Sequence, residues 1–448
     1  MSRSRLRLAV VGAGWAGLAA AVQATADGHA VTLLEMAGHC GGRARSVLLD
    51  DLRVDNGQHI LIGAYSETLR LMRLVGVDPV RVLQRRPLEL VYPDGSGLRL
   101  PRGNARLAFT WAVLRVRRWS WSERWSLLRH ALAWLRNGMR NPGVDTVAQL
   151  CASLPESVQA DLIEPLCIAA LNTPAAQASA TVFLRVLADA LFGASGSSDL
   201  LLPTTGLSDL FPLPALLWLE RRGATVRLGR RVQTIDHQSG GGWSVDVEPF
   251  DAVVLACSAA EAARLTAPIN PGWSAQLAAL RYEPIATVYL RRGDRALPSP
   301  MVALQSSADE PAQFAFDLER LGQHRAVVAF VVSGARRWLD DGLAALAQAV
   351  QRQAARALPG SFGGSPIVVH TALERRATFA CVPALARPSM AIAPALIAAA
   401  DYVDGPYPAT IEGAVRSGVR AAAAMGAVRG DEGEPAPSAA SMMQNAVP

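Results

Sequence analysis

The stretch Val10-Val11-Gly12-Ala13-Gly14-Trp15-Ala16-Gly17-Leu18 decides the fold of this chain. It joins an apolar strand, predicted over residues 6–11, to an alanine-rich helix. Gly12 permits the tight turn, Gly14 lets a pyrophosphate approach the backbone, and Gly17 lets the helix pack close to the strand. The N-terminus of that helix then faces the phosphates. The spacing therefore predicts a dinucleotide-binding βα turn.

A second apolar strand is predicted over residues 30–35 and ends at Glu35. An acid about 20 residues after the glycines is placed to bind the ribose hydroxyls of a dinucleotide. Gly41-Gly42-Arg43 follows after a short turn, where the glycine pair lets the backbone pass under a pyrophosphate and Arg43 supplies charge-assisted hydrogen bonds. These residues predict a site for the ADP half of a dinucleotide, and the glycine motif alone does not choose between NAD and FAD.

Composition limits which partners the chain is expected to bind. Of its 448 residues, 50% are hydrophobic and 18% are charged, which suits a large core and more than one domain. The mean hydropathy of +0.19 fits contact with a membrane or an apolar substrate. An alanine-rich sequence from a GC-rich genome would give the same value, and composition leaves these explanations open. All 44 basic residues are arginine, so no lysine chemistry is available. They are spread along the chain without a nucleic-acid motif, so no nucleic-acid partner is expected despite the net charge of +6.

The cysteines point to a reducing compartment. The chain has 5 cysteines with no C-x-x-C pair, which argues against a disulfide framework and against a metal site. No run of about 20 apolar residues is present for a membrane span. We therefore expect a cytoplasmic protein without a bound metal.

Strand and helix patterns predict an α/β protein with two interleaved domains. The nucleotide-binding domain is expected from residues 1–85, 221–260 and 371–427. An α+β substrate domain is expected from residues 86–220, largely helical, and 261–370. Residues 428–448, rich in proline, serine and alanine, are predicted to form a disordered tail.

Two runs carry a resemblance to a known superfamily. Glu35-(x5)-Gly41-Gly42-Arg43-(x2)-Ser46 resembles part of the FAD fingerprint of the flavin amine oxidase/phytoene desaturase superfamily. Ala400-Asp401, Pro408-Ala409-Thr410 and Ser417-Gly418 are similar to its closing signature, although most relatives have glycine where this chain has Ala400. The resemblance implies a Rossmann-like FAD-binding domain of the amine oxidase/phytoene desaturase type. It also implies a helix that points its N-terminus at the flavin, where it would stabilise the negative charge of the reduced ring.

A set of cofactor-binding residues follows from these motifs and from the resemblance. The expected FAD contacts are Gly12, Gly14, Trp15, Ala16, Gly17, Glu35, Met36, Gly41, Gly42, Arg43, Gly57, Gln58, His59, Val232, Asp401, Pro408, Ala409 and Thr410.

Further blocks resemble one subfamily, the hydroxysqualene dehydroxylases. These blocks are Asp55-Asn56-Gly57-Gln58-His59 with Gly63-Ala64-Tyr65, the run from Pro165 to Pro174, the run from Ser198 to Ser208, and Arg376-Ala377-Thr378-Phe379. The resemblance implies reductive dehydroxylation of hydroxysqualene to squalene in hopanoid biosynthesis, with an apolar isoprenoid substrate. There is no second G-x-G-x-x-G for a nicotinamide cofactor, so the electron donor stays unidentified.

Such a reaction needs a general acid beside the flavin. His59 and Asp55 are candidates, because the family block places their segment near the isoalloxazine ring. Tyr407, beside the C-terminal flavin helix, is a third. The alternative is that Asp55 caps a turn and His59 only hydrogen-bonds the flavin.

Other functions stay open from the sequence. Amine oxidases of this superfamily commonly use a lysine near flavin N5, and this chain has none. Desaturation of a carotenoid or oxidation of protoporphyrinogen also uses FAD and an apolar substrate. A non-enzymatic FAD-binding scaffold would be expected to have disrupted glycine motifs, and both motifs are intact.

Residues 106–140 combine tryptophan with arginine. Five of the ten tryptophans lie there, at Trp111, Trp119, Trp121, Trp125 and Trp134, interleaved with eight arginines. Aromatic and basic residues on an amphipathic helix are typical of a contact with a membrane surface. We therefore expect peripheral contact with the inner membrane, the alternative being a helix packed on the core with its arginines outward.

Overall fold

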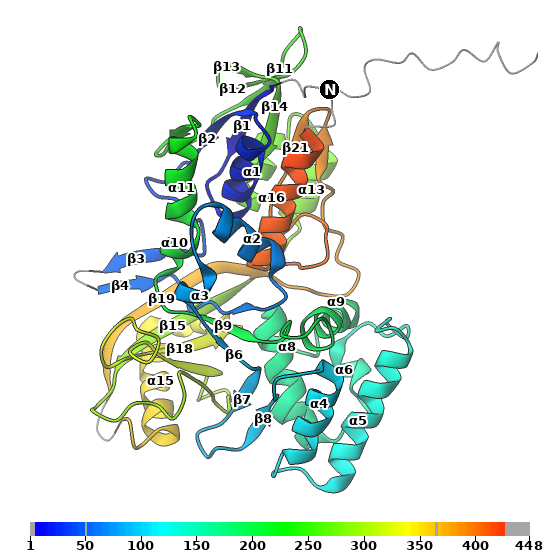
Figure 1. Ribbon diagram of the computed structural model, residues 1–448, viewed down its shortest axis with the longest axis vertical. Helices are drawn as coiled ribbons and strands as arrows, with labels where there is room; N and C mark the ends of the chain where they lie inside the picture. Colours follow the sequence, from blue (N-terminus) through cyan, green and yellow to red (C-terminus); the bar gives the residue numbers. More distant parts are fainter. Residues whose placement is uncertain (1–4, 50–51, 363–365, 426–448) are drawn as a thin grey trace, which may run out of the picture.

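The computed structural model describes residues 5–49, 52–362 and 366–425. The predicted tail at 428–448 lies outside the described residues. A parallel sheet with its helices occupies one end of the long axis of the molecule (Figure 1). At the other end, an antiparallel sheet and a layer of helices lie side by side (Figure 1).

The parallel sheet collects strands from three distant parts of the chain. Its order is β10-β2-β1-β14-β21-β20, and only β20 runs antiparallel to its neighbour. The six strands are β1 (Arg7–Val11), β2 (Ala30–Leu34), β10 (Thr225–Arg227), β14 (Ala252–Leu255), β20 (Ala391–Ala393) and β21 (Leu396–Ala398). The central strands β1 and β14 are almost wholly buried and apolar, as expected for a parallel sheet covered on both faces. The predicted α/β class is confirmed.

Small residues bring the helices of this sheet close together. Helix α1 (Trp15–Ala26) packs against α16 (Ile411–Met425), although nearly 400 residues separate them along the chain. A Cβ atom added at Gly418 would lie 2.2 Å from the carbonyl oxygen of Ala16, so only glycine allows this approach. Helix α11 (Pro212–Arg221) also contacts α1, although we expected it to end the substrate domain; the domain boundaries stay a prediction.

The antiparallel sheet has the order β16-β17-β18-β15-β19. Its strands are β15 (Tyr282–Arg291), β16 (Met301–Ala303), β17 (Phe314–Asp317), β18 (Val327–Ser333) and β19 (Ile367–Phe379). Alternation along β15 sends Ala286, Val288 and Leu290 into a cluster with α15 (Leu343–Ala357), and sends Tyr289 to the opposite face. Gly342, whose φ is +88°, separates α15 from the preceding helix α14 (Arg337–Asp341).

The helical layer contains α4 (Ala105–Arg115), α5 (Trp121–Arg136), α6 (Val147–Leu150), α7 (Glu156–Val158), the π-helix η1 (Gln159–Ile163), α8 (Glu164–Leu171), α9 (Ala180–Val186) and the π-helix η2 (Leu187–Leu191). The helical region predicted over 106–140 is thus two helices. The break has a local cause, because Ser120 and Glu123 form a capping box that starts α5 afresh.

The remaining elements connect these layers. They are β3 (Ser46–Leu49), β4 (Leu52–Asp55), β5 (Leu61–Ile62), α2 (Ser66–Leu74), α3 (Pro79–Val82), β6 (Leu83–Arg86), β7 (Glu89–Val91), β8 (Gly97–Arg99), β9 (Leu200–Pro203), α10 (Leu207–Leu210), β11 (Ile235–His237), β12 (Trp243–Val245), β13 (Glu248–Phe250), α12 (Ala259–Thr266) and α13 (Pro271–Ala278). Within the described ranges, none of the helices has the length and apolar character needed to cross a bilayer.

Candidate functional site

A cavity of about 1100 Å³ is lined by residues from both ends of the molecule. Its wall contains the glycine-rich loops of the parallel sheet, the β19 segment around Glu374, and the start of α16. The other part of the wall is apolar, and its large side chains include Ile60, Leu166, Phe183, Val186, Leu187, Leu191, Ile285, Phe314, Phe316 and Val331. A polar cradle therefore opens into an apolar chamber.

The cradle consists of two glycine loops in contact. Gly12 has a φ of +110°, and a Cβ atom there would lie 2.5 Å from the carbonyl oxygen of Ala256. The Gly41 amide donates to the carbonyl oxygen of Ala13 at 2.8 Å, which joins the second loop to the first. A Cβ atom on Gly42, whose φ is +60°, would lie 3.2 Å from Cα of Gly14. Backbone therefore faces backbone here, as a bound pyrophosphate requires.

Glu35 shapes the first glycine loop. Its carboxylate accepts from the backbone amide of Ala13 at 2.6 Å and from that of Ala37 at 2.8 Å. The side chain lines the cavity, at the end of β2 where the sequence predicted a ribose-binding acid. It thus ties the end of the second strand to the turn that follows the first.

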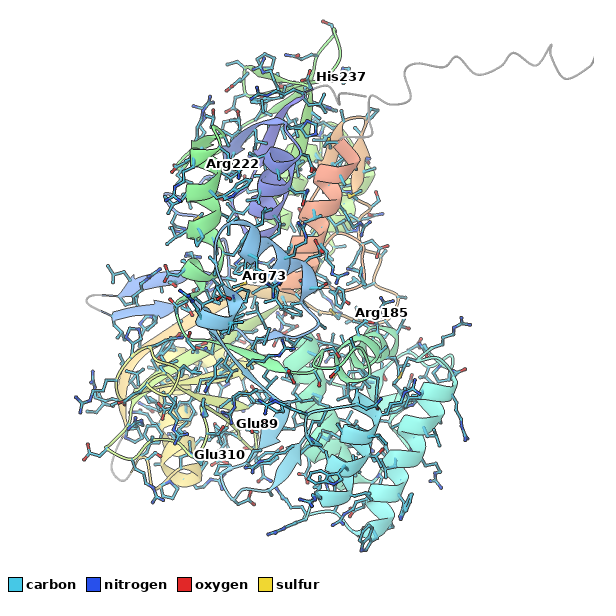
Figure 2. The ribbon with its side chains drawn as sticks, viewed as in Figure 1. Arg73, Glu89, Arg185, Arg222, His237 and Glu310 are labelled. Atoms are coloured by element: carbon cyan, nitrogen blue, oxygen red, sulfur yellow. The ribbon has the colours of Figure 1, made fainter. Side chains whose placement is uncertain are left out.

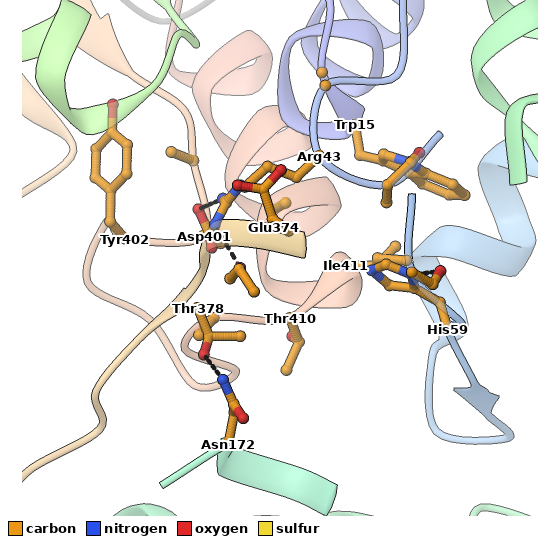
Figure 3. A pocket seen from close by; sticks show the side chains of 18 of the residues that line it. Trp15, Arg43, His59, Asn172, Glu374, Thr378, Asp401, Tyr402, Thr410 and Ile411 are labelled. Carbon is orange, nitrogen blue, oxygen red and sulfur yellow. Dashed lines mark hydrogen bonds and ion pairs between the residues drawn. The ribbon is translucent and has the colours of Figure 1, made fainter. Parts of the chain in front are cut away.

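Arg43 joins segments that are far apart in the sequence. Its guanidinium lies 2.6 Å from the carboxylate of Asp401, 358 residues later, and donates to the carbonyl oxygen of Ala377 at 2.9 Å (Figure 3). We expected Arg43 to act on a phosphate, and its pairing with Asp401 was not anticipated. Asp401 is 7% exposed, so the arginine balances a nearly buried charge.

Helix α16 presents its N-terminus to the cavity. The hydroxyl oxygen of Thr410 accepts from the Gly413 amide at 3.0 Å and the hydroxyl donates to the carbonyl oxygen of Tyr407 at 3.0 Å. Thr410 and Ile411 line the same cavity as Asp401 (Figure 3). The partial positive charge of a helix N-terminus stabilises negative charge on a group bound there.

Most of the predicted cofactor residues line the cavity, and three predicted site residues do not. Gly17 faces the helix–strand contact, where a Cβ atom would lie 1.8 Å from the carbonyl oxygen of Gly12. Pro408 is buried beside the cavity wall. Asp55 is the third. The other predicted contacts that line the cavity are Gly12, Gly14, Trp15, Ala16, Glu35, Met36, Gly41, Gly42, Arg43, Gly57, Gln58, His59, Val232, Asp401, Ala409 and Thr410.

Asp55 is held away from the cavity. Its Oδ1 accepts from the hydroxyl of Ser46 at 2.7 Å and from the Leu207 amide at 2.9 Å, the first residue of α10. The side chain thus accepts from the first amide of a short helix, whereas the alternative expected it to cap a turn. In this position Asp55 does not face a group bound in the cavity.

The pH dependence of stability tests this placement. Burial raises the pKa of Asp55 to about 6, although the hydrogen bonds from Leu207 and Ser46 oppose the shift. The folded state therefore holds this proton more tightly than the unfolded chain, and ionisation costs stability as the pH rises from about 4 to 6. We expect Asp55→Asn to raise the free energy of unfolding by about 2 kcal/mol at pH 8, and to change it little at pH 4.

Urea titrations of wild type and variant at both pH values measure the difference. The variant keeps an Oδ1 acceptor, so its activity should stay close to that of wild type. Loss of activity without any change in stability would instead support Asp55 as a proton donor.

His59 lines the cavity in a defined tautomer. Its Nδ1 lies 2.8 Å from the carbonyl oxygen of Gly57, which accepts only, so Nδ1 carries a proton (Figure 3). Burial lowers the pKa of His59, and the charge of Arg43 acts in the same direction. The imidazole is therefore neutral at pH 7, with Nε2 as an acceptor rather than a donor.

Tyr407 lines the cavity where the C-terminal segment meets the helical layer. Asp189 also lines the cavity, and Arg185 donates to its carboxylate at 2.6 Å. Asp189 lies on the π-helix η2, a conformation found frequently at functional sites. Burial raises the pKa of Tyr407, and the nearby Asp189 carboxylate adds to the shift, so the hydroxyl keeps its proton at neutral pH.

Several cavity residues were not predicted. Asn172, with a left-handed φ of +46°, donates to the Thr378 hydroxyl at 2.8 Å and accepts from the Gly334 amide at 3.0 Å (Figure 3). Glu374 accepts from the Asn56 side chain at 3.0 Å. Asn56, Asn172 and Thr378 belong to the blocks quoted for the subfamily resemblance, and that signal could have selected them.

Comparisons with known proteins agree with this arrangement. A family model described as flavin containing amine oxidoreductase matches residues 15–426. Hydroxysqualene dehydroxylases from Sinorhizobium fredii and Rhodopseudomonas palustris are 28% identical to this chain over 431 and 435 residues. Each match covers 92% of this chain and 96% of the relative.

Solved structures share the fold. An oxidoreductase from Methanosarcina mazei superposes with a TM-score of 0.72 at 14% identity, over 94% of this chain and 100% of the other. Cyclohexylamine oxidase from Brevibacterium oxydans gives a TM-score of 0.67 at 17% identity, over 94% and 99%. These likenesses confirm the amine oxidase type of fold expected from the sequence. The chain therefore belongs to the flavin containing amine oxidoreductase family, and the resemblance to hydroxysqualene dehydroxylases within it is confirmed.

Proposed function

We propose that this flavoprotein binds FAD and reduces hydroxysqualene to squalene. The observation that carries the proposal is the continuity of the glycine cradle with an apolar chamber in one cavity. The names of the two relatives matched over most of their length support the substrate.

The cradle residues fit FAD. Gly14 and Gly42 leave the space that a pyrophosphate needs, and Glu35 has a carboxylate for the ribose hydroxyls. Within the described residues, Nε2 of Gln58 is buried in the cavity region without a hydrogen-bond partner. A buried amide donor without a partner is costly, and an acceptor on the cofactor or substrate would satisfy it.

The chamber suits a hydrocarbon chain. Its aliphatic and aromatic side chains exclude water from the carbon that loses the hydroxyl group, so that a cationic carbon is shielded from attack by water. Replacing hydroxyl by hydrogen consumes two electrons and two protons and releases water. Reduced FAD, when bound, supplies hydride chemistry, and a separate two-electron donor must keep it reduced.

The departing hydroxyl needs a proton. We assign its delivery to Tyr407, whose hydroxyl is protonated and lines the cavity. His59 is neutral and offers an acceptor at Nε2, so it orients a donor instead of supplying the proton. Desaturation of a carotene and oxidation of an amine remain the competing functions.

A single-turnover experiment tests the proposal. The purified protein is checked for a flavin spectrum, reduced without oxygen, and mixed with hydroxysqualene. We expect the flavin to reoxidise while squalene appears in equal amount. If the reduced protein ignores hydroxysqualene while the oxidised protein turns over an amine or a carotene, the proposal is wrong.

The same experiment tests the proton donor. Tyr407→Phe keeps the ring under the Arg416 guanidinium, 4.8 Å away, and removes only the hydroxyl. We expect squalene formation to slow about 100-fold with the flavin still bound. An unchanged rate would mean that the proton comes from another group.

A further inference from the structure

We propose that the outward faces of α4 and α5 form a docking surface for an anionic lipid bilayer. The inference deepens the proposed function, because it names the surface from which the apolar substrate would reach the protein. The two helices lie at the end of the molecule away from the parallel sheet, with α5 at its edge (Figure 1).

Tertiary packing gives the five tryptophans of this region different exposures, and Trp134 is half-buried against the core. Trp119 is 3% exposed and donates from its indole nitrogen to Asp161, so it belongs to the core. Trp111, Trp121 and Trp125 are 45%, 63% and 62% exposed. No other described tryptophan is found among the exposed large hydrophobic residues.

The exposed apolar residues form stripes at helical spacing. On α5, Trp121 and Trp125 are one turn apart, and Leu132, which is 46% exposed, continues the same face two turns later. On α4, Leu107 and Trp111 are again one turn apart, with Leu107 72% exposed. An exposed apolar stripe of this kind marks an interaction site, since each helix already buries its other face.

The charge of this surface selects the partner. Residues 105–140 contain eight arginines and one acidic residue, so their net charge of +7 exceeds the +6 of the whole chain. The carboxylate of the one acid, Glu123, accepts hydrogen bonds from the Ser120 amide at 2.6 Å and from the Ser157 hydroxyl. Among the described residues, Arg118 is the one arginine of these eight within 4.0 Å of a carboxylate. A surface so positive repels a second copy of itself and attracts anionic lipid.

The arginines also lie beside the tryptophans. The guanidinium carbon of Arg115 is 3.7 Å from the ring centroid of Trp111, and that of Arg124 is 4.7 Å from Trp121. Arg129 and Arg136 are exposed along the apolar stripe of α5. Tryptophan at the level of the headgroups, with arginine reaching the phosphates, is the arrangement of interfacial helices.

The surface lies one layer from the cavity. Phe109 on the inner face of α4 contacts Phe192, with ring centroids 5.3 Å apart. Phe192 directly follows Leu191, which lines the apolar chamber. Docking through α4 and α5 would therefore bring the chamber close to the bilayer in which a long hydrocarbon dissolves.

Vesicle flotation without substrate tests the inference. The probes are phosphatidylcholine vesicles with and without phosphatidylglycerol, at low and high salt. We expect wild type to float with the anionic vesicles, and less so as salt screens the charges. Trp121→Ser/Trp125→Ser and Arg129→Glu/Arg136→Glu should each lower the bound fraction about tenfold.

A matched control lies at the other end of the molecule. Arg221→Glu/Arg222→Glu makes the same charge change at the end of α11, with Arg222 beside the parallel sheet (Figure 2). We expect this variant to bind vesicles like wild type. The inference is overturned if wild type ignores anionic vesicles, if the control loses binding equally, or if the tryptophan variant instead separates a dimer in solution. Because no substrate is present, these results do not depend on whether hydroxysqualene is reduced.

Discussion

Gly14→Val is expected to remove the flavin from the purified protein while leaving its fold intact. Gly14 has φ and ψ of −73° and 179°, which any residue adopts, and a Cβ atom there would meet only Cα of Gly42, at 4.0 Å. A valine side chain would fill the space between the two glycine loops that the pyrophosphate needs. We expect binding of FAD to weaken about 100-fold or more, equivalent to roughly 2.8 kcal/mol.

The ratio of flavin to protein absorbance and a titration of the apoprotein with FAD measure this effect. Gly38→Val is the matched control, because an added Cβ atom at Gly38 meets nothing within 4 Å and the residue does not line the cavity. Its flavin content should equal that of wild type. A Gly14→Val protein that keeps its flavin would show that this cradle is not the cofactor site.

Arg43→Met is expected to lower the free energy of unfolding of the apoprotein by about 3 kcal/mol. The change removes the partner 2.6 Å from Asp401 and leaves that carboxylate 7% exposed and unpaired. This value is at the lower end of the stability losses typical of breaking a buried ion pair, because the Arg43 side chain is itself 38% exposed and partly solvated. The loss should also loosen the tie between the second glycine loop and the C-terminal segment.

A double-mutant cycle separates the pair from its surroundings. Asp401→Asn in the Arg43→Met background removes the orphaned charge, so it should recover part of the lost stability in a urea titration. The exposed pair Arg227–Glu248 is the control, and Arg227→Met should cost no more than about 1 kcal/mol. Equal losses at both sites would mean that Arg43 and Asp401 are not a buried coupled pair.

Local motifs predicted the glycine loops and the acid that line one side of the cavity. Gly12 has a φ of +110°, and Gly17 packs on the carbonyl oxygen of Gly12 earlier in the same motif, so these features of the turn follow from residue type and spacing. Glu35 is only 22 residues from Ala13, whose amide it binds, so the position of the acid at the end of β2 also follows from local sequence. The family, and with it the amine oxidase type of fold, could be read from such fingerprints.

Side-chain direction could not be read in the same way. Asp55 and His59 are four residues apart and belong to the same family block. His59 nevertheless lines the cavity, whereas Asp55 accepts from the first amide of α10 and does not line the cavity. Two partners decide this. Ser46 lies opposite Asp55 in the β3–β4 hairpin, and Leu207 comes from a helix about 150 residues later. No pattern within the block contains that information.

The sequence by itself determined the first glycine turn, the second glycine loop and the apolar character of the segments 86–220 and 261–370. The tertiary structure decided that Arg43 pairs with Asp401, and that Trp121 and Trp125 face outward while Trp119 is buried. The physical reason is the range of the interactions. Turns and strands depend on neighbours along the chain, whereas burial and ion pairing depend on segments that meet only after the whole chain has folded.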